Sequence, residues 1–308
     1  MLRHRRFILI LNLSLSCFLI IFLIIQSNEQ NPALINYCLI NNITSSKEFY
    51  SNLVYIPTLN ILFCDVPKAA STNLRRLLYG YLNQSNSFTN LDRKQIWLDH
   101  KDFFKKYYLT KTNFEFILNN SNRNLFKFLL VRHPFQRIYS VYYDKFVNNH
   151  IEDTLSGWKQ LEEDILLQMN KNQTLLTIRR NDIKLDFRTF LLYIIDSIKR
   201  NQLINSHWEQ IVQRCAFCSI NYNFIGKIEN FHQDKKFLLK KLNQNSNKII
   251  LKFPSKEIDK QSKKQILLND SQLIQFFRDT IQNEDDFEIL IDYYKPDFQL
   301  FNYEIPNL

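Results

Sequence analysis

The stretch CDVPKAASTNLRR, residues 64–76, combines residue types that bind anions. It follows a short apolar run, residues 60–64, and leads into apolar residues at helical spacing, which predicts a strand, a loop and a helix. A helix N-terminus offers unpaired N–H groups and a positive dipole end to a phosphate. Lys68 adds a charge, and Ser71 and Thr72 add hydroxyl donors. The stretch has no glycine and lacks the spacing of an ATPase or GTPase loop, so a capped helix beside a solvated lysine is the simpler interpretation of it alone.

A second stretch, residues 129–146 (LLVRHPFQRIYSVYYDKF), carries polar groups where another strand is expected to end. Arg132 lies at the carboxyl end of that strand, and Pro134 suits the first turn of the helix that follows. Ser140 lies two turns into this helix. Because open α/β sheets bind ligands over the carboxyl ends of their strands, we expect Arg132 and Ser140 to reach an anion there.

Residues 207–231 (HWEQIVQRCAFCSINYNFIGKIENF) form a third stretch with ligating side chains. Cys215 and Cys218 suggest a zinc site with His207 or His232, but no second cysteine pair or spaced histidine pair completes four ligands. Disulfide bonds are therefore expected for at least two of the cysteines, with the pairing left open. The four cysteines beyond the apolar N-terminal segment are Cys38, Cys64, Cys215 and Cys218.

The elements that must position these groups alternate between strands and helices. This alternation predicts one α/β domain with a central, mostly parallel sheet covered by helices on both faces. The expected strands are residues 61–66, 126–131 and 222–226. The expected helices are about 72–82, 134–148 and 186–200, with further helix in the C-terminal third.

The chain is basic, with 40 Lys and Arg against 30 Asp and Glu in 308 residues. Such an excess favours an anionic partner, for example a nucleic acid, a membrane surface, a nucleotide phosphate or an acidic polymer. No zinc-finger, RNP or basic-zipper pattern is present, so the sequence argues against nucleic acid.

The N-terminus predicts a membrane anchor. The cationic residues 1–6 precede 19 uncharged residues, 7–25, whose helical length roughly matches the ~30 Å hydrocarbon core. A cleaved signal peptide is the alternative, but residues 26–30 offer no small-residue cleavage site. The positive charge keeps the N-terminal end in the cytoplasm. The predicted segments are a cytoplasmic tail (1–6), a transmembrane signal-anchor (7–25), a luminal stem (26–55) and a luminal domain (56–308). Five Asn-x-Ser/Thr sequons agree with a luminal location, at Asn42, Asn83, Asn119, Asn172 and Asn269.

In their order and separation, the three stretches resemble the Golgi carbohydrate sulfotransferases of the HNK-1 and chondroitin/dermatan 4-O-sulfotransferase type. Residues 66–76 are similar to their 5′-phosphosulfate loop, Val-Pro-Lys-x-x-x-Thr-Asn-x-x-Arg. Residues 132–146 resemble their 3′-phosphate motif, Arg-x-Pro-Phe-x-Arg-x-x-Ser-x-Tyr-x-Asp-Lys-Phe. Residues 207–231 are similar to their His-Trp…Cys-x-x-Cys…Tyr-x-Phe-Ile-Gly-Lys-x-Glu segment. Residues 294–303 resemble their terminal Tyr-x-x-Asp-Phe-x-x-Phe-x-Tyr. The resemblance covers residues 61–303, with a poorly matched middle.

The resemblance implies a P-loop-like sulfotransferase fold and a catalytic domain in residues 56–308. The implied reaction moves a sulfuryl group from 3′-phosphoadenosine-5′-phosphosulfate (PAPS), without a metal, to a sugar hydroxyl of a glycan or proteoglycan chain. Lys68 would contact the oxygen bridging phosphate and sulfate, while Arg132 and Ser140 would hold the 3′-phosphate. The residues implied at the 5′-phosphosulfate are Pro67, Lys68, Ala69, Ala70, Ser71, Thr72 and Asn73. The implied location is the Golgi membrane, as a single-pass type II protein with a luminal catalytic domain.

The acceptor hydroxyl must lose a proton to a general base. His207 and His100 are the candidates, because a neutral histidine suits this role near pH 7, and a carboxylate such as Glu229 stays open. His133 is expected to line the 3′-phosphate site. The departures from the family pattern are Ser71 for Cys, Leu74 for Trp and Asn223 for Asp. None removes a charge that contacts the donor, so we expect an active enzyme.

Two other classes of function share many of these features. A catalytically inactive luminal protein that binds glycans would share all of them. A P-loop kinase is disfavoured because the sequence lacks the context of a Mg²⁺-binding Asp and because the domain is predicted to be luminal.

The predicted topology can be measured on the full chain. Because residues 7–25 would hold the N-terminus in the cytosol, an N-terminal tag should be accessible only from that side. Endoglycosidase should increase the gel mobility of the protein by removing glycans from luminal sequons. A soluble, unglycosylated product would contradict the signal-anchor.

Overall fold

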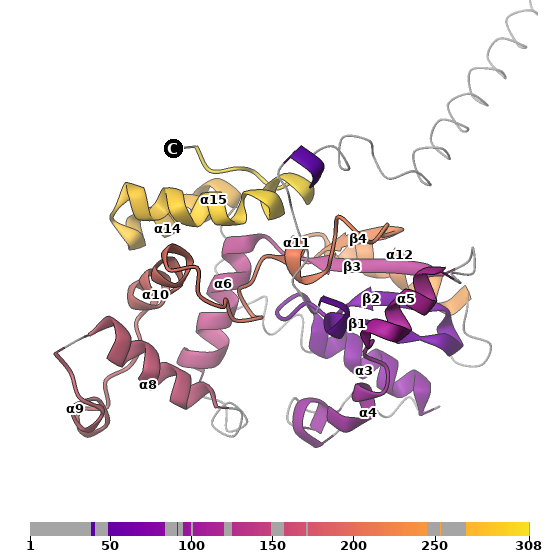
Figure 1. The fold of residues 1–308 in the computed structure, drawn as a ribbon, viewed down its shortest axis with the longest axis horizontal. Coiled ribbons are helices and arrows are strands. Elements are labelled where there is room, and N and C mark those ends of the chain that lie inside the picture. Colours follow the sequence, from indigo (N-terminus) through magenta and orange to yellow (C-terminus); the bar gives the residue numbers. More distant parts are fainter. Residues whose placement is uncertain are drawn as a thin grey trace, which may run out of the picture.

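The computed structural model describes residues 38–40, 49–83, 91, 95–99, 101–119, 125–148, 157–170, 172–244, 253 and 269–307. Within these residues, four strands form one sheet in the order β1-β2-β3-β4 (Figure 1). The strands are β1 (Leu53–Ile56), β2 (Ile61–Cys64), β3 (Phe126–Val131) and β4 (Phe224–Lys227). β2, β3 and β4 are parallel, and β1 pairs antiparallel with β2 at the edge of the sheet.

The parallel strands bring polar residues to one edge of the sheet. β2 and the carboxyl half of β3 are buried, as expected for short apolar strands covered on both faces. In β4, a Cβ atom at Gly226 would come within 2.8 Å of the Leu130 side chain, so this close approach suits glycine. Because β2 and β3 run in the same direction, Asp65 and Arg132, which follow them, lie at the same edge.

The helices form two groups, which α6 connects (Figure 1). α3 and α4 lie beside the sheet, whereas α8, α9, α10, α14 and α15 lie away from it. The helices are α3 (Ser71–Leu82), α4 (Lys101–Lys105), α5 (Lys111–Asn119), α6 (Pro134–Tyr142), α8 (Trp158–Met169), α9 (Leu175–Arg180), α10 (Phe187–Lys199), α11 (Ile211–Arg214), α12 (Phe231–Gln244), α14 (Asp270–Ile281) and α15 (Glu284–Leu300). Short 3₁₀ turns are η1 (Phe49–Asn52) and η2 (Pro57–Leu59), and π-helical turns are η4 (Gln95–Asp99) and η5 (Tyr143–Val147).

Aromatic packing fixes α6 against the second helix group. Pro134 starts the helix, where its missing N–H leaves no bond unmade. The Phe135 ring stacks on Phe277 of α14 with centroids 4.3 Å apart, and meets the edge of Phe298 of α15 at 5.5 Å. The position of Ser140, further along α6, therefore depends on helices that come more than 130 residues later in the chain.

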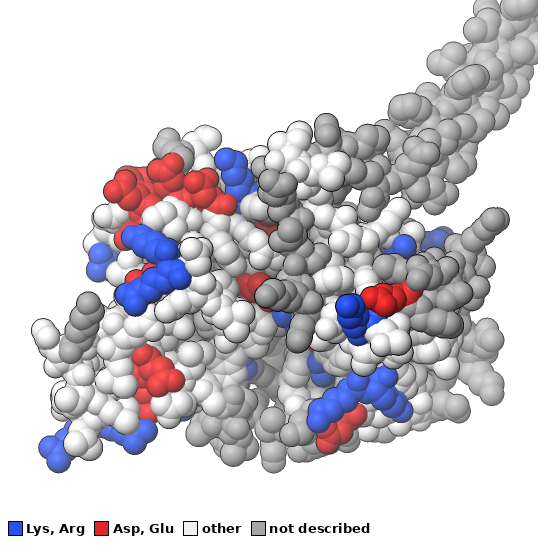
Figure 2. All heavy atoms as spheres, viewed as in Figure 1, with Lys and Arg blue, Asp and Glu red and all other residues white. Residues whose placement is uncertain are grey.

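Charged side chains are unevenly distributed over the surface. Acidic groups gather over α14 and α15 on the face in Figure 2. Glu284, Asp285 and Asp286 occupy the first turn of α15, where the helix dipole favours negative charge. The net positive charge of the chain is therefore not spread evenly over this face.

Two disulfide bonds connect distant parts of the chain. Cys64, the last residue of β2, bonds to Cys215, which follows α11. Cys38 bonds to Cys218, 180 residues away. The Cys-x-x-Cys pair is thus neither a zinc site nor an internal bridge, and the prediction that these cysteines are structural is confirmed.

The predicted α/β fold with a mostly parallel sheet is confirmed, and the expected strands and helices all occur within a few residues of their predicted bounds. β1 was not predicted, because a four-residue edge strand is too short for a clear pattern. It begins inside the range expected for the stem, 26–55, whose boundary with the domain stays a prediction. No helix in the described residues is both long and apolar enough to span a membrane. Residues 7–25 lie outside that part, so the signal-anchor also stays a prediction.

Candidate functional site

The loop between β2 and α3 has an unusual backbone. Lys68 has φ 68° and Ala70 has φ 61°, in the left-handed region that usually requires glycine. Alternation of left-handed and other residues in a short loop turns successive N–H groups inwards and makes a concave anion site. The first bond within α3 runs from Leu74 N–H to the Ala70 carbonyl (3.0 Å). The N–H groups of Ser71, Thr72 and Asn73 precede it and are available to a ligand.

Two arginines from distant segments hold this loop from either end. Arg132 Nη1 donates to the Lys68 carbonyl oxygen (3.3 Å). Arg214 donates from Nε and Nη2 to the Asp65 carbonyl oxygen (3.2 and 3.1 Å). The Asp65 carboxylate is paired with Arg75 at 2.7 Å and also accepts from the Tyr108 hydroxyl. Burial would raise the pKa of Asp65, but Arg75 and Tyr108 outweigh it and the pKa is lowered.

The side chains at the start of α3 are oriented by their neighbours. Trp97 Nε1 donates to Thr72 Oγ1 (2.9 Å), and the Arg75 guanidinium lies over the Trp97 ring at 3.9 Å. Because the Thr72 oxygen accepts this bond, its own proton can point towards an anion. Asn73 accepts a bond from Arg76 Nη1 (3.0 Å). Asn73 thus stabilises the start of the helix and offers its N–H group.

Lys68 belongs to a buried charge cluster that the sequence did not predict. Its Nζ lies 2.8 Å from Asp144 Oδ2, and Lys145 Nζ lies 3.8 Å from the same oxygen. Asp144 and Lys145 occur on the π-helical turn η5, and Lys145 also lies over the Trp158 ring at 5.0 Å. Both residues are part of the second motif, but nothing in the sequence indicated that they meet Lys68. The only available signal was their charge, one turn beyond Ser140.

The proposed 3′-phosphate residues lie at the end of β3 and in α6. Arg132 is 5% exposed and Ser140 6%. Burial lowers the pKa of Arg132 to about 10, against the opposing effect of the Glu229 carboxylate, so the guanidinium remains charged at neutral pH. A buried, charged arginine at the end of a strand is suited to hold an anion.

His133 and Glu229 have structural partners. The His133 ring is fully buried, and its Nδ1 accepts from the Phe135 N–H at the start of α6. It therefore caps α6 through Nδ1, and the expectation that it lines the 3′-phosphate site stays a prediction. Glu229 accepts from the His133 N–H (2.8 Å) and from the Tyr303 hydroxyl (3.0 Å). These two bonds fix both carboxylate oxygens, which argues against Glu229 as a general base.

The structure brings His207 into the neighbourhood of Lys68. Its Nδ1 lies 3.1 Å from Asn205 Oδ1, and its ring meets the edge of Trp158 at 4.7 Å. Burial, followed by the charges of Lys145 and Lys68, holds the pKa of His207 well below 6.5. The ring is therefore unprotonated at neutral pH, which is the state that a general base requires. His100, the other candidate, lies outside the described residues.

Glu209 is a further carboxylate that sequence reasoning missed. It lies 3.4 Å from Arg214 Nη1, and burial raises its pKa against the lowering effect of that arginine. The Glu209 carbonyl accepts from the buried Arg137, which also donates to the His207 carbonyl (3.3 Å). Arg137 therefore fixes the backbone that carries both His207 and Glu209.

The described residues fit a phosphosulfate donor. A concave loop with three available N–H groups lies beside the ammonium group of Lys68, and Arg132 occupies the same edge of the sheet. In the part of the chain that the structure describes, no three His, Cys, Asp or Glu side chains gather as metal ligands.

Comparisons with known proteins agree with this geometry. The model of a family described as "Sulfotransferase family" matches residues 51–304. Carbohydrate sulfotransferase 11 of Rattus norvegicus is 29% identical over 251 residues, which are 80% of this chain and 65% of the relative. Carbohydrate sulfotransferase 9 of Homo sapiens is 26% identical over 249 residues, 80% of this chain and 52% of the relative. Carbohydrate sulfotransferase 14 of Danio rerio is 29% identical over 248 residues, 80% of this chain and 60% of the relative. The matched part thus spans between about half and two thirds of these relatives, and no solved structure matches the chain.

The role of Arg132 can be tested with nucleotides that differ in one phosphate. Arg132→Ala should weaken binding of 3′-phosphoadenosine-5′-phosphate (PAP) roughly ten- to a hundredfold, because a charge-assisted bond is worth ~1.5–3 kcal/mol. It should weaken binding of adenosine 5′-phosphosulfate much less, because that ligand has no 3′-phosphate and is affected only through the bond from Arg132 to the Lys68 carbonyl. Isothermal titration calorimetry measures both affinities. Arg180→Ala, at an exposed position in α9, is the matched control and should change neither.

Equal loss of both nucleotides by a folded Arg132→Ala protein would contradict the assignment. Arg132 would then act through its bond to the Lys68 carbonyl alone. Arg132→Lys should remain impaired with PAP, because an ammonium group cannot reproduce the guanidinium fork.

Proposed function

The chain belongs to the sulfotransferase family, and from this membership we propose that it transfers a sulfuryl group from PAPS to a hydroxyl group of a glycan or proteoglycan chain. The observation that carries the proposal is the concave loop that presents Lys68. The buried Arg132 donates to the Lys68 carbonyl, and the charge of Lys68 helps to keep the buried His207 neutral. The names of the carbohydrate sulfotransferases that it resembles support a glycan as the acceptor.

PAPS, when bound, supplies the sulfuryl group and a phosphate leaving group. The N–H groups of residues 71–73 and the Thr72 hydroxyl bind the 5′-phosphosulfate end, and Arg132 with Ser140 binds the 3′-phosphate. Lys68 neutralises negative charge on the leaving oxygen. In-line transfer of such a group depends on positioning and charge neutralisation more than on covalent chemistry, by analogy with phosphoryl transfer.

Asp144 positions the ammonium group of Lys68. The 2.8 Å pair is buried, so the lysine side chain is held in one place instead of sampling many rotamers. Lys145, 3.8 Å from the same carboxylate oxygen, keeps Asp144 partly neutralised when Lys68 interacts with an anion. We assign Asp144 a positioning role and Lys68 the direct contact.

His207 removes the proton from the acceptor hydroxyl. Its lowered pKa keeps the imidazole neutral at pH 7, and Asn205 orients the ring through Nδ1. With Nδ1 donating to Asn205, Nε2 is the nitrogen that is left to accept a proton. His100 is the alternative base.

The proposed location is the Golgi membrane, with the catalytic domain in the lumen. The predicted anchor and the two disulfide bonds support it, since disulfides form in oxidising compartments. Asn172 is exposed and suits glycosylation, whereas the Asn269 side chain caps α14.

Transfer of labelled sulfate from PAPS to a panel of glycans tests the proposed reaction directly. Lys68→Ala should lower kcat at least ~10²-fold, because one charge-stabilising donor is worth ~3 kcal/mol, while PAP affinity falls much less. Asp144→Asn should also lower kcat and should leave the affinity for PAP unchanged. Lys184→Ala, a surface lysine paired with Asp182, is the control. If intact PAP binding came with no transfer to any glycan, an inactive glycan-binding protein would be the better conclusion.

The pH dependence of kcat tests the base. His207 accepts a proton only when neutral, so activity should fall as the pH drops through its folded pKa. Because that pKa is well below 6.5, the rate should remain flat from pH 7.5 to 6.5 and decline only in more acidic buffer. An unperturbed histidine would already lose about half of its activity near pH 6.5. A midpoint at or above 6.5, or an unchanged profile in a partly active His207→Gln protein, would exclude His207 as the base.

A further inference from the structure

The proposed base lies on a segment that ends in a very short helix. Residues 207–214 run from His207 to the end of α11, and α11 has only four residues. A single helical turn is not stable by itself, because its first N–H groups have no partner within the helix. Gln210, at the N-cap position, makes no side-chain bond to these groups. Contacts from other elements must therefore fix the position of this segment.

α15 provides such contacts through two side chains. The Asp297 carboxylate accepts from the N–H groups of Ile211 (2.8 Å) and Val212 (2.9 Å), the first two residues of α11. The Tyr294 hydroxyl donates to the Trp208 carbonyl. Because Tyr294 and Asp297 are three positions apart on a helix, they lie on the same face of α15. We call this pair of side chains the α15 clamp.

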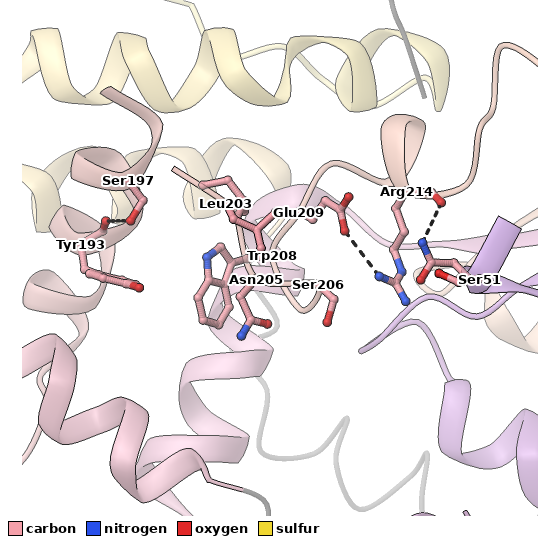
Figure 3. A pocket seen from close by; sticks show the side chains of 11 residues that line it. Ser51, Tyr193, Ser197, Leu203, Asn205, Ser206, Trp208, Glu209 and Arg214 are labelled. Carbon is pink, nitrogen blue, oxygen red and sulfur yellow. Dashed lines mark hydrogen bonds and ion pairs between the residues drawn. The ribbon is translucent and has the colours of Figure 1, made fainter. Parts of the chain in front are cut away.

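Part of the same segment borders a pocket of about 630 Å³ instead of packed side chains. Trp208, Glu209 and Arg214 line this pocket, and Figure 3 shows Glu209 facing Arg214 at its wall. Few neighbours restrain the segment on the pocket side, since a cavity offers no packing contacts. The position of the segment therefore depends more strongly on the bonds from α15.

The two ends of the segment are held in different ways. After α11, the Cys64–Cys215 disulfide attaches the chain covalently to the end of β2. At the other end, Arg137 donates to the His207 carbonyl (3.3 Å), and Tyr294 donates to the carbonyl of the next residue. Loss of the α15 clamp should therefore displace His207 and leave the contact with the donor loop in place.

The Asp297 carboxylate is charged at neutral pH. Burial raises its pKa to about 6, against the lowering effects of Arg137 and of the two N–H bonds, and Glu209 adds a smaller increase. The ionised form, which accepts from both N–H groups, thus predominates at pH 7.

The pKa of His207 depends on the position of the segment. Burial lowers it most, and the charges of Lys145, Lys68, Arg214 and Arg137 lower it further. Each of these effects weakens when the ring moves outwards. Displacement of the segment should therefore raise the pKa of His207 towards 6.5, the ordinary value for histidine.

We propose that Tyr294 and Asp297 are positioning residues for sulfuryl transfer, which hold the segment 207–214 so that His207 stays beside the donor loop. Both side chains are fully buried, so they act through the segment and not by contact with a substrate. This assignment rests on the proposed function, in which His207 is the base. It gives a role to the first two residues of the terminal motif, residues 294–303.

Histidine NMR on the full chain tests the α15 clamp without using activity. The His207 signal is identified by its loss in His207→Gln, and in the unmodified protein it should titrate only well below 6.5. Tyr294→Phe removes one hydroxyl donor, and Asp297→Asn leaves one oxygen for two N–H groups. In both variants the midpoint of the His207 titration should rise towards 6.5.

The kinetics of the same variants should show a fall in kcat without a loss of donor binding. Both should lower kcat at least about tenfold, because a displacement of ~1 Å at a catalytic group can cost about 10²-fold. PAP affinity should stay unchanged, since the disulfide holds the end of the segment that contacts the donor loop. Activity should also begin to fall at a higher pH than in the unmodified protein.

Each clamp variant has a matched control. Tyr222→Phe also removes a hydroxyl that donates to a backbone carbonyl, that of Cys215 (2.8 Å), at the end that the disulfide already holds. Asp186→Asn alters an aspartate that caps another helix, α10. Neither control should change the His207 midpoint or kcat.

Three results would overturn the inference. They are an unchanged His207 midpoint in the folded clamp variants, kcat values equal to those of the controls, and a loss of PAP affinity as large as the loss of kcat. If Asp297→Asn does not fold, Tyr294→Phe, which lacks a single bond, decides alone. Failure of the unmodified protein to bind PAP would instead contradict the proposed function, while the NMR titration would still measure the clamp.

Discussion

Buried cations hold the loop between β2 and α3 in a conformation that its own sequence does not favour. Left-handed backbone costs roughly 1–2 kcal/mol for a residue with a side chain, and both Lys68 and Ala70 adopt it. Arg132 and Arg214 donate to carbonyl oxygens of the loop, and Asp144 binds the Lys68 ammonium. Each of these three residues comes from a different segment. The concave anion site therefore forms only when β3, α11 and the turn after α6 have packed around it.

The same cations account for two properties of the site. Their charge attracts an anionic donor. Together with burial, which is the larger cause, the charges of Lys145 and Lys68 also lower the pKa of His207 and keep it neutral. Asp144 pairs with Lys68, and Glu209 pairs with Arg214. This pairing allows the opposite charges to be buried together. One arrangement of charges thus prepares both a site for the donor and a base for the acceptor.

The Cys64–Cys215 disulfide reinforces this arrangement where Arg214 contacts the loop. Cys64 precedes Asp65 and Cys215 follows Arg214, so the covalent bond lies beside the two hydrogen bonds from Arg214 to the Asp65 carbonyl. It links the end of β2 to the segment that carries His207 and one wall of the pocket. In the chain-entropy model, closing the loop between residues 151 positions apart is worth about 5 kcal/mol, because it restricts the unfolded chain.

Local patterns in the sequence determined the main strands, α3, α6 and α10, because apolar periodicity reports which face of an element is buried. They also identified the loop, Arg132 and His207 as members of one site through a resemblance to known motifs. The sequence did not reveal the left-handed backbone at Lys68 and Ala70, because glycine is the usual signal for that conformation and neither residue is a glycine. Nor did it reveal the pair of Lys68 with Asp144 or the partners of the Cys-x-x-Cys cysteines. These contacts join residues between 76 and 180 positions apart, and only the packing of the helices around the sheet brings them together.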